Sequence, residues 1–405
     1  MKKIIVGLLG FVLSLSLGLP LAGADTLKVE GLFYLDGTHV SVSIVDGKII
    51  QLERLPESGD APGVYLAPGL IDLQINGFTG VDFSDQELST EDMQKATRAL
   101  WKAGITTYLP TVVTADGKSL LKSFELLSLA TSDPEISASI PGYHLEGPYI
   151  SPVKGFRGAH LEKYIRPPDW EEFTRLQEAS QNRIKLITVA PDMEGAIPFI
   201  RDCAASGVLV SLGHHNGSSD QIKKAADAGA SLSTHLGNGC ANMINRHNNP
   251  LWPQLAEDRL SVTLIADGFH LKQDELKTFY GMKGIERTIL VSDALDLAGL
   301  PPGEYTRGER QVVLTQDVVK FPAEDVLAGA ASPISTCVMN MMTFTGCSLA
   351  EAIRMASTNP AKFLGLDELG LILPGKRADL ILFDMVDGRM IIKQTIVAGR
   401  VVYSE

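Results

Sequence analysis

Four acidic or histidine side chains in the middle of the chain each follow a short apolar run. Glu146 ends "GYHLE", His214 ends "VLVSLGH", His235 ends "ASLSTH" and Asp293 ends "RTILVSD". One carboxylate with two imidazoles is a ligand set that first-row divalent metals accept, with a position left for water. Glu146, His214 and His235 are therefore candidate metal ligands. Asp293 is the candidate acid or base, because a free carboxylate can take a proton from water that a bound metal has made acidic.

Each candidate also has a purely structural interpretation. A histidine at the end of a strand is more often a hydrogen-bonded core residue than a ligand, and Glu146 could instead cap the next turn. His144 faces the same side of its strand as Glu146 and competes with it as a ligand, whereas His215 faces away from His214. Asp267 precedes a glycine and could cap a loop. Seven of the eight histidines fall between residues 144 and 270, and this concentration favours a common site.

Strand-like and helix-like segments alternate through the middle of the chain. β-branched runs such as "ITTYLPTVV", "RIKLITVAP" and "LSVTLIADGFH" are separated by predicted helices over 89–104, 193–206, 218–229 and 272–281. This alternation predicts a parallel sheet, and at least seven such strands favour a closed (β/α)8 TIM-like barrel of the α/β class. An open doubly wound sheet is disfavoured, because no G-x-G-x-x-G loop follows an early strand. Catalytic residues of such barrels lie at the carboxyl ends of the strands, where the four candidates fall.

Both ends of the chain have the pattern of antiparallel sheet. Residues 27–55 and 378–405 alternate apolar and polar positions and carry turn dipeptides such as Asp-Gly. We therefore expect a small β-sandwich domain built from both termini, with an N-terminal part over 25–67 and a C-terminal part over 369–405. The barrel is expected over 68–368.

The first residues have the pattern of an export signal. Lys2 and Lys3 precede an apolar run, and "AGA" at 22–24 is a small-x-small cleavage motif. We expect residues 1–24 to be a signal peptide and the mature protein to be exported, either periplasmic or secreted. The alternatives are an uncleaved membrane anchor, since the run is about long enough to span a bilayer, and a cytoplasmic protein if the signal is not used.

The net charge limits the classes of binding partner, and the cysteine content limits the number of disulfides. A net charge of −12 over 405 residues, with a sequence pI near 5.2, argues against a nucleic-acid partner. Four cysteines without a C-x-x-C pair are too few for a disulfide framework, so buried free thiols are expected. After signal cleavage we expect no membrane partner.

Several motifs together resemble one enzyme family. They are "APGLIDLQINGFTG", "HLEGPYIS", "GHHNGSSD", "THLGNG", "ADGFH", "VSDA" and "LGLILPGKRADLILFD". As a set, these motifs resemble the N-acetylglucosamine-6-phosphate deacetylases of the amidohydrolase superfamily. The resemblance implies a metal-dependent (β/α)8 barrel with a small β-sandwich, a small-molecule amino-sugar substrate, hydrolysis of its N-acetyl amide, and a homodimer.

The same resemblance implies catalytic roles. Glu146, His214 and His235 would hold one divalent metal ion, which we expect to be Zn²⁺, with Fe²⁺ or another divalent ion as alternatives. Asp293 would be the catalytic acid and base. His270 would lie against the amide carbonyl of the bound substrate and share stabilisation of the oxyanion.

Contacts with the substrate also follow from the resemblance. Asn238 and Gly239 match a segment whose backbone meets the substrate. Arg246 matches an arginine that binds the sugar phosphate. His160 resembles a histidine that can reach the phosphate site of a partner subunit.

The chain departs from the family pattern at several positions. Gln74 and Asn76 occupy the place where many amidohydrolases carry H-x-H, and because amides are poor transition-metal ligands, one metal is expected. The chain reads "HLGNGCANM" where the family has H-L-[FY]-N-A-M, and His247 and Asn248 are altered neighbours of Arg246. A signal peptide also conflicts with a phosphorylated, cytoplasmic sugar. The alternatives are therefore an amidohydrolase acting on another N-acyl substrate, such as a non-phosphorylated amino sugar or an N-acyl amino acid, and a non-catalytic sugar-binding relative.

Overall fold

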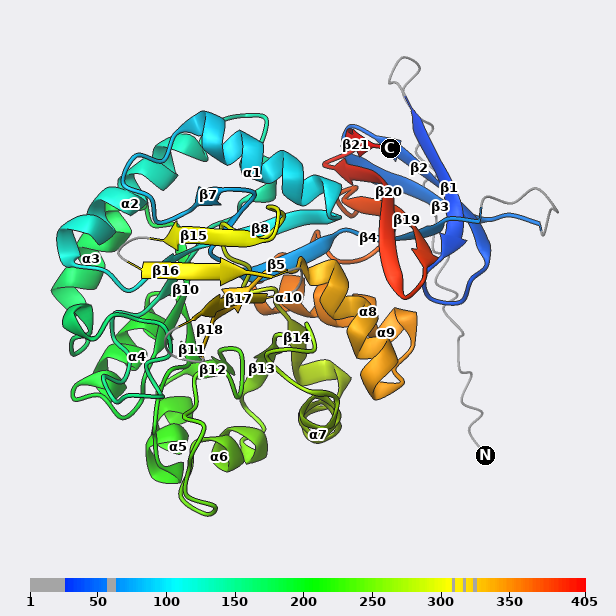
Figure 1. Cartoon of the computed structure of the whole chain (residues 1–405). Helices are drawn as coiled ribbons and strands as arrows, with labels where there is room; N and C mark the ends of the chain where they lie inside the picture. Colours follow the sequence, from blue (N-terminus) through cyan, green and yellow to red (C-terminus); the bar gives the residue numbers. More distant parts are fainter. Residues whose placement is uncertain (1–25, 57–62, 308–309, 316–317, 323–325) are drawn as a thin grey trace, which may run out of the picture.

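The computed structural model describes residues 26–56, 63–307, 310–315, 318–322 and 326–405. In these residues eight parallel strands follow one another around a barrel in chain order. They are β5 (Leu70–Ile75), β8 (Ile105–Val113), β9 (Tyr143–Glu146), β10 (Ile184–Val189), β11 (Leu209–Leu212), β12 (Ala230–Ser233), β13 (Ser261–Leu264) and β14 (Thr288–Leu290). The first and last strands meet just beyond β14, where the amide of Asp293 donates to the carbonyl of Gln74 (2.9 Å) and that of Asn76 donates to Ala294 (2.8 Å). The predicted (β/α)8 barrel is confirmed (Figure 1).

Helices surround the barrel strands. They are α1 (Thr90–Lys102), α2 (Gly117–Ala130), α3 (Trp170–Ala179), α4 (Ala196–Ala205), α5 (Ser219–Asp227), α6 (Leu251–Ala256), α7 (Gln273–Lys283), α8 (Ile334–Thr345), α9 (Leu349–Ala356) and α10 (Thr358–Phe363). The four predicted helices correspond to α1, α4, α5 and α7. In α1, Ser89 and Asp92 form a capping box, and Leu100 and Trp101 are buried on the face toward the core. The helix ends before Gly104, whose φ of 83° favours glycine.

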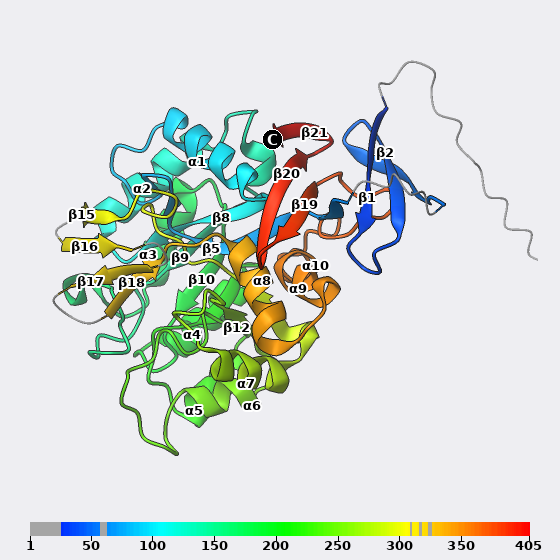
Figure 2. The same cartoon turned by 45° about the vertical axis from the view of Figure 1, so that its right-hand side comes forward.

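A separate seven-stranded sheet joins the two ends of the chain. Its order is β21-β20-β19-β4-β1-β2-β3. The strands are β1 (Leu27–Phe33), β2 (His39–Val45), β3 (Lys48–Arg54), β4 (Tyr65–Pro68), β19 (Leu380–Val386), β20 (Arg389–Val397) and β21 (Arg400–Ser404). The antiparallel pairing of β19 with β4 connects the terminal segments. Figure 2 shows β19 and β20 between the barrel and strands β1 and β2, as expected for a small domain built from both termini.

A four-stranded antiparallel sheet between β14 and α8 was not predicted from the sequence. Its strands are β15 (Gly303–Arg307), β16 (Arg310–Leu314), β17 (Val318–Phe321) and β18 (Val326–Ala330). Val312, Leu314 and Val319 pack with Leu295 and Leu297, which follow Asp293 in the chain. The strands are short and partly exposed, so their hydrophobic pattern does not distinguish them from loops between barrel elements.

The interior of the barrel is filled by side chains. Apolar residues on or next to six of the eight strands form one buried cluster, which includes Ile71, Leu73, Leu109, Leu186, Leu232, Ile265 and Ile289. Hydroxyl and imidazole groups from β8 to β12 form a polar layer, in which Thr188 lies 2.8 Å from both His144 Nε2 and Thr234 Oγ1. The interior of the barrel is therefore filled, and a site for a substrate must lie at the ends of the strands.

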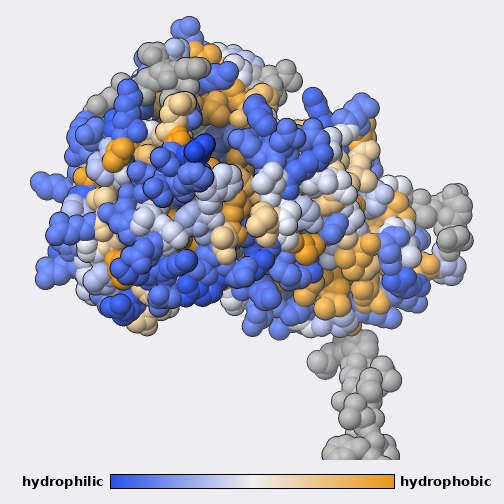
Figure 3. Space-filling model, turned by 90° about the horizontal axis from the view of Figure 1, so that it is seen from below, coloured by the Kyte–Doolittle hydropathy of each residue, from blue (hydrophilic) through white to orange (hydrophobic). Residues whose placement is uncertain are grey.

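One face of the described surface is mainly polar. Figure 3 shows one face covered largely by hydrophilic residues, with apolar side chains gathering toward the end that carries the terminal sheet. Within the described ranges, every helix is too short or too polar to cross a bilayer. All four cysteines are free, and Cys203, Cys337 and Cys347 are buried, as predicted. The predicted signal peptide lies outside the described residues.

Candidate active site

Three side chains that follow different strands meet at the carboxyl end of the barrel. Glu146 is the last residue of β9, and His214 and His235 lie two residues beyond β11 and β12. His235 Nε2 lies 2.9 Å from Glu146 Oε1 and 3.1 Å from His214 Nε2, and all candidate ligand atoms lie within 4.8 Å of one another. All three residues are buried. The structure brings the three predicted ligands together, and this set can hold a divalent metal ion.

The orientation of His214 is set by the loop that follows β9. Its Nδ1 lies 2.9 Å from the carbonyl oxygen of Phe156. A carbonyl can only accept, so Nδ1 carries the proton and the lone pair of Nε2 faces Glu146 and His235. The backbone at Gly239 packs so closely that a Cβ there would lie 2.7 Å from the main-chain nitrogen of His214. The ring is held with the nitrogen needed for metal binding toward the site.

Asp293 lies next to the ligand group and is held by two amides. Asn76 Nδ2 donates to Asp293 Oδ1 at 2.7 Å, and Gln74 Nε2 contacts the same oxygen at 3.3 Å while donating to Glu146 Oε1 at 2.8 Å. Burial, and then the nearby carboxylate of Glu146, raises the pKa of Asp293 above its ordinary value. A carboxyl group with a raised pKa is suited to accept and return a proton near neutral pH.

The carboxylate of Glu146 has the opposite tendency. Burial alone would raise its pKa, but the neighbouring imidazoles of His214 and His235 hold the pKa well below its usual range. Glu146 is therefore ionised, as a metal ligand must be.

The backbone is strained at three of these residues. His214, His235 and Asp293 have φ values of 51°, 28° and 50°, in the left-handed region that side chains other than glycine rarely adopt. Such strain concentrates at functional sites, where surrounding contacts hold it. It turns each side chain toward the site immediately after a strand ends.

The other two histidines considered as ligands take part in different interactions. His144 Nε2 lies 2.8 Å from Thr188 Oγ1, and burial lowers the pKa of His144 to about 4, so its ring is neutral. The main-chain amide of Gly217 donates to Nδ1 of His215 at 3.0 Å. His144 therefore belongs to the polar layer below the candidate ligands, and His215 faces away from them.

His160 covers the ligand group from the loop after β9. Its Nε2 lies 3.8 Å from Glu146 Oε2, and its ring centroid is 4.5 Å from that of His214. Its Nδ1 lies 2.8 Å from the hydroxyl of Thr114. Burial, and then the nearby His214, lowers the pKa of His160 to about 3. The structure thus places this residue in the site of its own subunit.

His270 reaches the site from the loop after β13. Its Nδ1 lies 2.6 Å from Asp267 Oδ2, and both side chains are almost completely buried. Asp267 also accepts the main-chain amides of Phe269 and His270 at 2.8 Å each, so it caps this loop as the sequence suggested. Its contact with His270 is a second role. The sequence did not reveal this role, because an aspartate is equally suited to cap a loop and to bind an imidazole.

The remaining predicted substrate residues lie on the loop after β12. The main-chain amide of Asn238 donates to the carbonyl of His235 at 2.9 Å, and its Nδ2 is buried without a partner among the described residues. Gly239 touches His214. Arg246 is exposed, and its carbonyl accepts from Trp252 Nε1 at 2.8 Å. In the described part of the chain, the side chain of Arg246 is not joined to the other site residues.

One charged group beside the site was missed by sequence reasoning. Arg307, at the end of β15, lies 2.6 Å from Asp296 and 3.0 Å from Asp82. Asp296 follows Asp293 by three residues, and Asp82 ends β7 (Val81–Asp82) in the loop after Asn76. The sequence offers no signal for this cluster, because its three residues are far apart along the chain.

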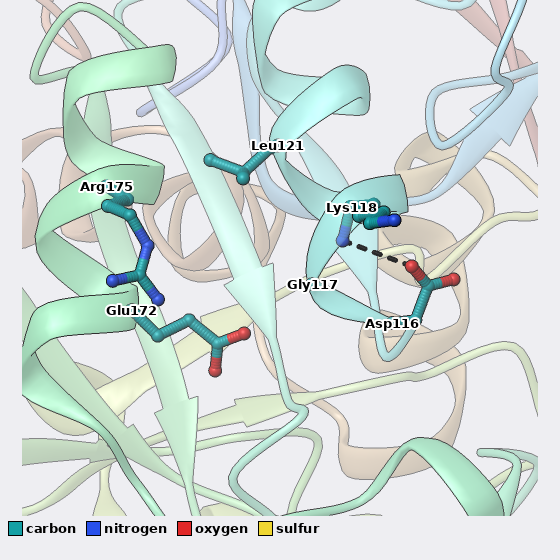
Figure 4. A pocket seen from close by; sticks show the side chains of 6 residues that line it. All are labelled: Asp116, Gly117, Lys118, Leu121, Glu172 and Arg175. Carbon is teal, nitrogen blue, oxygen red and sulfur yellow. Dashed lines mark hydrogen bonds between the residues drawn. The ribbon is translucent and has the colours of Figure 1, made fainter.

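A separate hollow of about 370 Å³ lies between the start of α2 and α3 (Figure 4). Its lining residues are Asp116, Gly117, Lys118, Leu121, Glu172 and Arg175. Asp116 caps α2, and Glu172 holds Arg166 at 2.7 Å, so both carboxylates have structural partners. The hollow shares no residue with the candidate active site.

Comparison with known proteins agrees with this geometry. A model of the Amidohydrolase family matches residues 65–402. The chain is 33% identical over 343 residues to the N-acetylgalactosamine-6-phosphate deacetylase of Escherichia coli O157:H7 (84% of this chain, 89% of the relative). It is 32% identical over 354 residues to the N-acetylglucosamine-6-phosphate deacetylase of Bacillus subtilis strain 168 (84% and 88%).

Solved structures of N-acetylglucosamine-6-phosphate deacetylases are also similar to this chain. The N-acetylglucosamine-6-phosphate deacetylase of Thermotoga maritima superimposes with a TM-score of 0.83 at 31% identity, covering 94% of this chain and 100% of that one. A mutant of the Mycobacterium smegmatis enzyme, solved in complex with N-acetyl-D-glucosamine-6-phosphate, superimposes with a TM-score of 0.84 at 26% identity and the same coverage. The chain therefore belongs to the amidohydrolase family and, within it, to the N-acetylglucosamine-6-phosphate deacetylases.

Proposed function

We propose that the chain hydrolyses the N-acetyl amide of an amino-sugar phosphate on a single divalent metal ion, with Zn²⁺ as that ion. The observation that carries this proposal is the meeting of Glu146, His214 and His235 beside Asp293. Relatives named for N-acetylglucosamine-6-phosphate and N-acetylgalactosamine-6-phosphate support the substrate class.

The donor set fits a metal of this kind. Two imidazole nitrogens and one ionised carboxylate converge in a buried space, and the proton of His214 is on the nitrogen that faces away. These are the ligand types that Zn²⁺ prefers, whereas Gln74 and Asn76 use their amides as donors to carboxylates. When bound, the ion would lower the pKa of water and polarise the amide carbonyl.

The chain's own residues would handle the proton. Asp293 is held by Asn76 and Gln74 with its carboxylate beside the ligand group. In this position it would take the proton from the attacking water and return it to the leaving amine nitrogen. Because burial raises its pKa, this carboxylate accepts a proton more readily than an exposed aspartate would.

The polar groups around Asp293 would bind the rest of the substrate. His270 would meet the carbonyl oxygen as negative charge develops there. Asn238 Nδ2, buried and without a partner among the described residues, is available as a donor to a sugar hydroxyl or phosphate. His160 covers the ligand group and would exclude bulk water once the substrate is bound.

Activity assays test the proposal. Purified protein should release acetate from N-acetylglucosamine-6-phosphate or its galactosamine isomer, lose this activity after chelation, and regain it with Zn²⁺. Asp293→Asn should keep normal metal content, measured by elemental analysis, while turnover falls by roughly a hundredfold to ten-thousandfold. Retained hydrolysis in metal-free protein, or turnover above a tenth of wild type in Asp293→Asn, would contradict the mechanism. Hydrolysis of N-acyl amino acids or neutral amino sugars alone would move the substrate assignment to that class.

Export is part of the proposal. The pattern of residues 1–24 supports cleavage and release into the periplasm or medium. Expression of the full chain in a bacterial host, followed by fractionation and N-terminal sequencing, measures this. A cytoplasmic protein that keeps Met1 would contradict export.

A further inference from the structure

The Asp267 carboxylate uses both of its oxygens as acceptors. Oδ1 accepts the main-chain amides of Phe269 and His270, and Oδ2 lies 2.6 Å from His270 Nδ1. Burial would raise the pKa of Asp267, but the hydrogen bond and charge of His270 hold it below its ordinary value. The carboxylate is therefore ionised, and the proton between the two residues belongs to Nδ1 of His270.

This assignment limits what His270 can do. A neutral imidazole has one N–H, and here Nδ1 carries it. The other nitrogen, Nε2, would then present a lone pair to the carbonyl oxygen of a substrate, and two acceptors repel each other. Only the imidazolium, which carries a proton on both nitrogens, can donate to the oxygen as it becomes negative.

We propose that Asp267 is a positioning residue which fixes the proton on Nδ1, so that His270 stabilises the oxyanion through Nε2 only as an imidazolium. The role of His270 toward substrate rests on the proposed function. The protonation pattern of the pair does not, because it follows from the contacts of Asp267 alone.

The surroundings strengthen this pair. The side chain of Asp267 is fully buried and that of His270 is 7% exposed, so water screens their interaction little. Asp293 faces His270 from the end of β14 and adds a second negative charge. Lys272, on the same loop, carries a positive charge that counteracts these negative charges. Its ammonium group donates to the carbonyl of Gly268 at 3.1 Å. Cys337, on α8, lies near Asp267, and burial raises its pKa well above the ordinary value, so it stays neutral.

The metal ligands complete this environment. Glu146 adds a negative charge near Asp293, whose pKa responds to both Glu146 and His270. A bound divalent ion would add positive charge there, so protonation must be measured in the metal-loaded protein.

Nitrogen-15 NMR of histidine-labelled protein reads the protons directly. In zinc-loaded wild type, the signals of His270, assigned by their loss in His270→Gln, should show a protonated Nδ1 at every pH and a proton on Nε2 that is lost as pH rises. In Asp267→Asn, the new amide can donate to Nδ1, so the neutral ring should carry its proton on Nε2. Wild-type His270 with a neutral ring protonated on Nε2 would overturn the proposal. This readout stands even if the substrate assignment fails.

Kinetics supply the second test. Asp267→Asn should lower kcat by on the order of a hundredfold with little change in KM, because one charged donor to the oxyanion is lost. The alkaline fall of kcat that depends on the imidazolium should flatten, since neutral His270 can then donate. Asp267→Glu should restore part of both effects.

A matched control separates positioning from capping. Like Asp267, Asp116 accepts hydrogen bonds from two main-chain amides, here at 3.1 Å each, but it contacts no histidine among the described residues. Asp116→Asn should lower the melting temperature without changing the pH profile. If Asp267→Asn behaves in the same way as Asp116→Asn, Asp267 is a loop cap only, and the proposal is wrong.

Discussion

At the scale of single residues, the polar groups around the site are held by other groups of the protein rather than by solvent. Asp72 in β5 is an example outside the catalytic group. Its Oδ1 accepts the main-chain amides of Gln74 and Ser292 at 3.2 Å each, while Oδ2 is buried without a partner among the described residues. Burial raises its pKa from 3.8 to about 7. Below about pH 7, Asp72 therefore supports the ends of β5 and β14 as an uncharged acid.

This raised pKa predicts a dependence of stability on pH. Between about 4 and 7 the unfolded chain loses the Asp72 proton and the folded chain keeps it, so the free energy of unfolding falls as pH rises through this window. Asp72→Asn keeps the acceptor and removes the titration. The variant should therefore gain stability relative to wild type as pH rises from 4 to 7, measured by urea unfolding at each pH. Parallel stability curves for the two proteins would show that Asp72 is ionised in the folded state throughout.

At the scale of elements, ion pairs connect the sheet β15–β18 to the two loops that follow the candidate site residues Asn76 and Asp293. Arg307 joins Asp296, in the loop after Asp293, to Asp82, in the loop after Asn76. Burial raises the pKa of Asp82, which Arg307 partly offsets. Two carboxylates share one guanidinium, so the pairing is needed to keep both charges in a partly buried place.

Removing the guanidinium should therefore destabilise the protein. Arg307→Met should lower the free energy of unfolding at pH 7 by about 2 kcal/mol. This loss lies between those typical of exposed and of buried ion pairs, because the side chain of Arg307 is partly exposed. The double variant Arg307→Met with Asp82→Asn should lose less than the sum of the single losses, since one unpaired carboxylate is gone. Strict additivity in urea unfolding would show that Arg307 and Asp82 are not coupled.

At the scale of the whole molecule, Arg246 is the predicted site residue that the folded chain leaves exposed. It lies on the loop between β12 and α6, together with the exposed Met243, and the exposed Trp252 follows at the start of α6. An exposed arginine next to a buried site can bind a substrate that lies between two surfaces. We propose that a second copy of the chain provides the second surface, in a homodimer whose Arg246 binds the sugar phosphate of the partner's site.

Mixed dimers test this arrangement. Arg246→Ala should raise KM for a phosphorylated substrate far more than for its neutral analogue, because a charge-assisted contact with a dianion is lost. Unfolding and refolding a mixture of Arg246→Ala and Asp293→Asn proteins should restore activity at low substrate that neither variant has alone. Absence of recovery in a sample shown to be dimeric by ultracentrifugation would place Arg246 in its own subunit's site. Equal KM effects on both substrates would mean that Arg246 binds no anion.

Local patterns in the sequence were enough to predict the barrel and the grouping of the candidate metal ligands. Strand ends can be recognised because buried parallel strands are short apolar runs, and the polar residue that follows each run must lie at the same end of the barrel. This is why Glu146, His214, His235 and Asp293 could be grouped before their contacts were known. The sheet from both termini followed in the same way from alternating residues and turn dipeptides at each end.

Only the tertiary structure decided which neighbours each of these side chains has. The sequence predicted that the amides of Gln74 and Asn76 are not ligands, but it did not reveal their partners in the fold, Glu146 and Asp293, which are far away in sequence. The contact of His214 with the carbonyl of Phe156, and the cluster around Arg307, likewise depend on loops whose paths no local pattern specifies. Strand periodicity is a property of adjacent residues and can be read from them. The proton positions and the charge pairs depend on distances across the barrel, which exist only after the chain has folded.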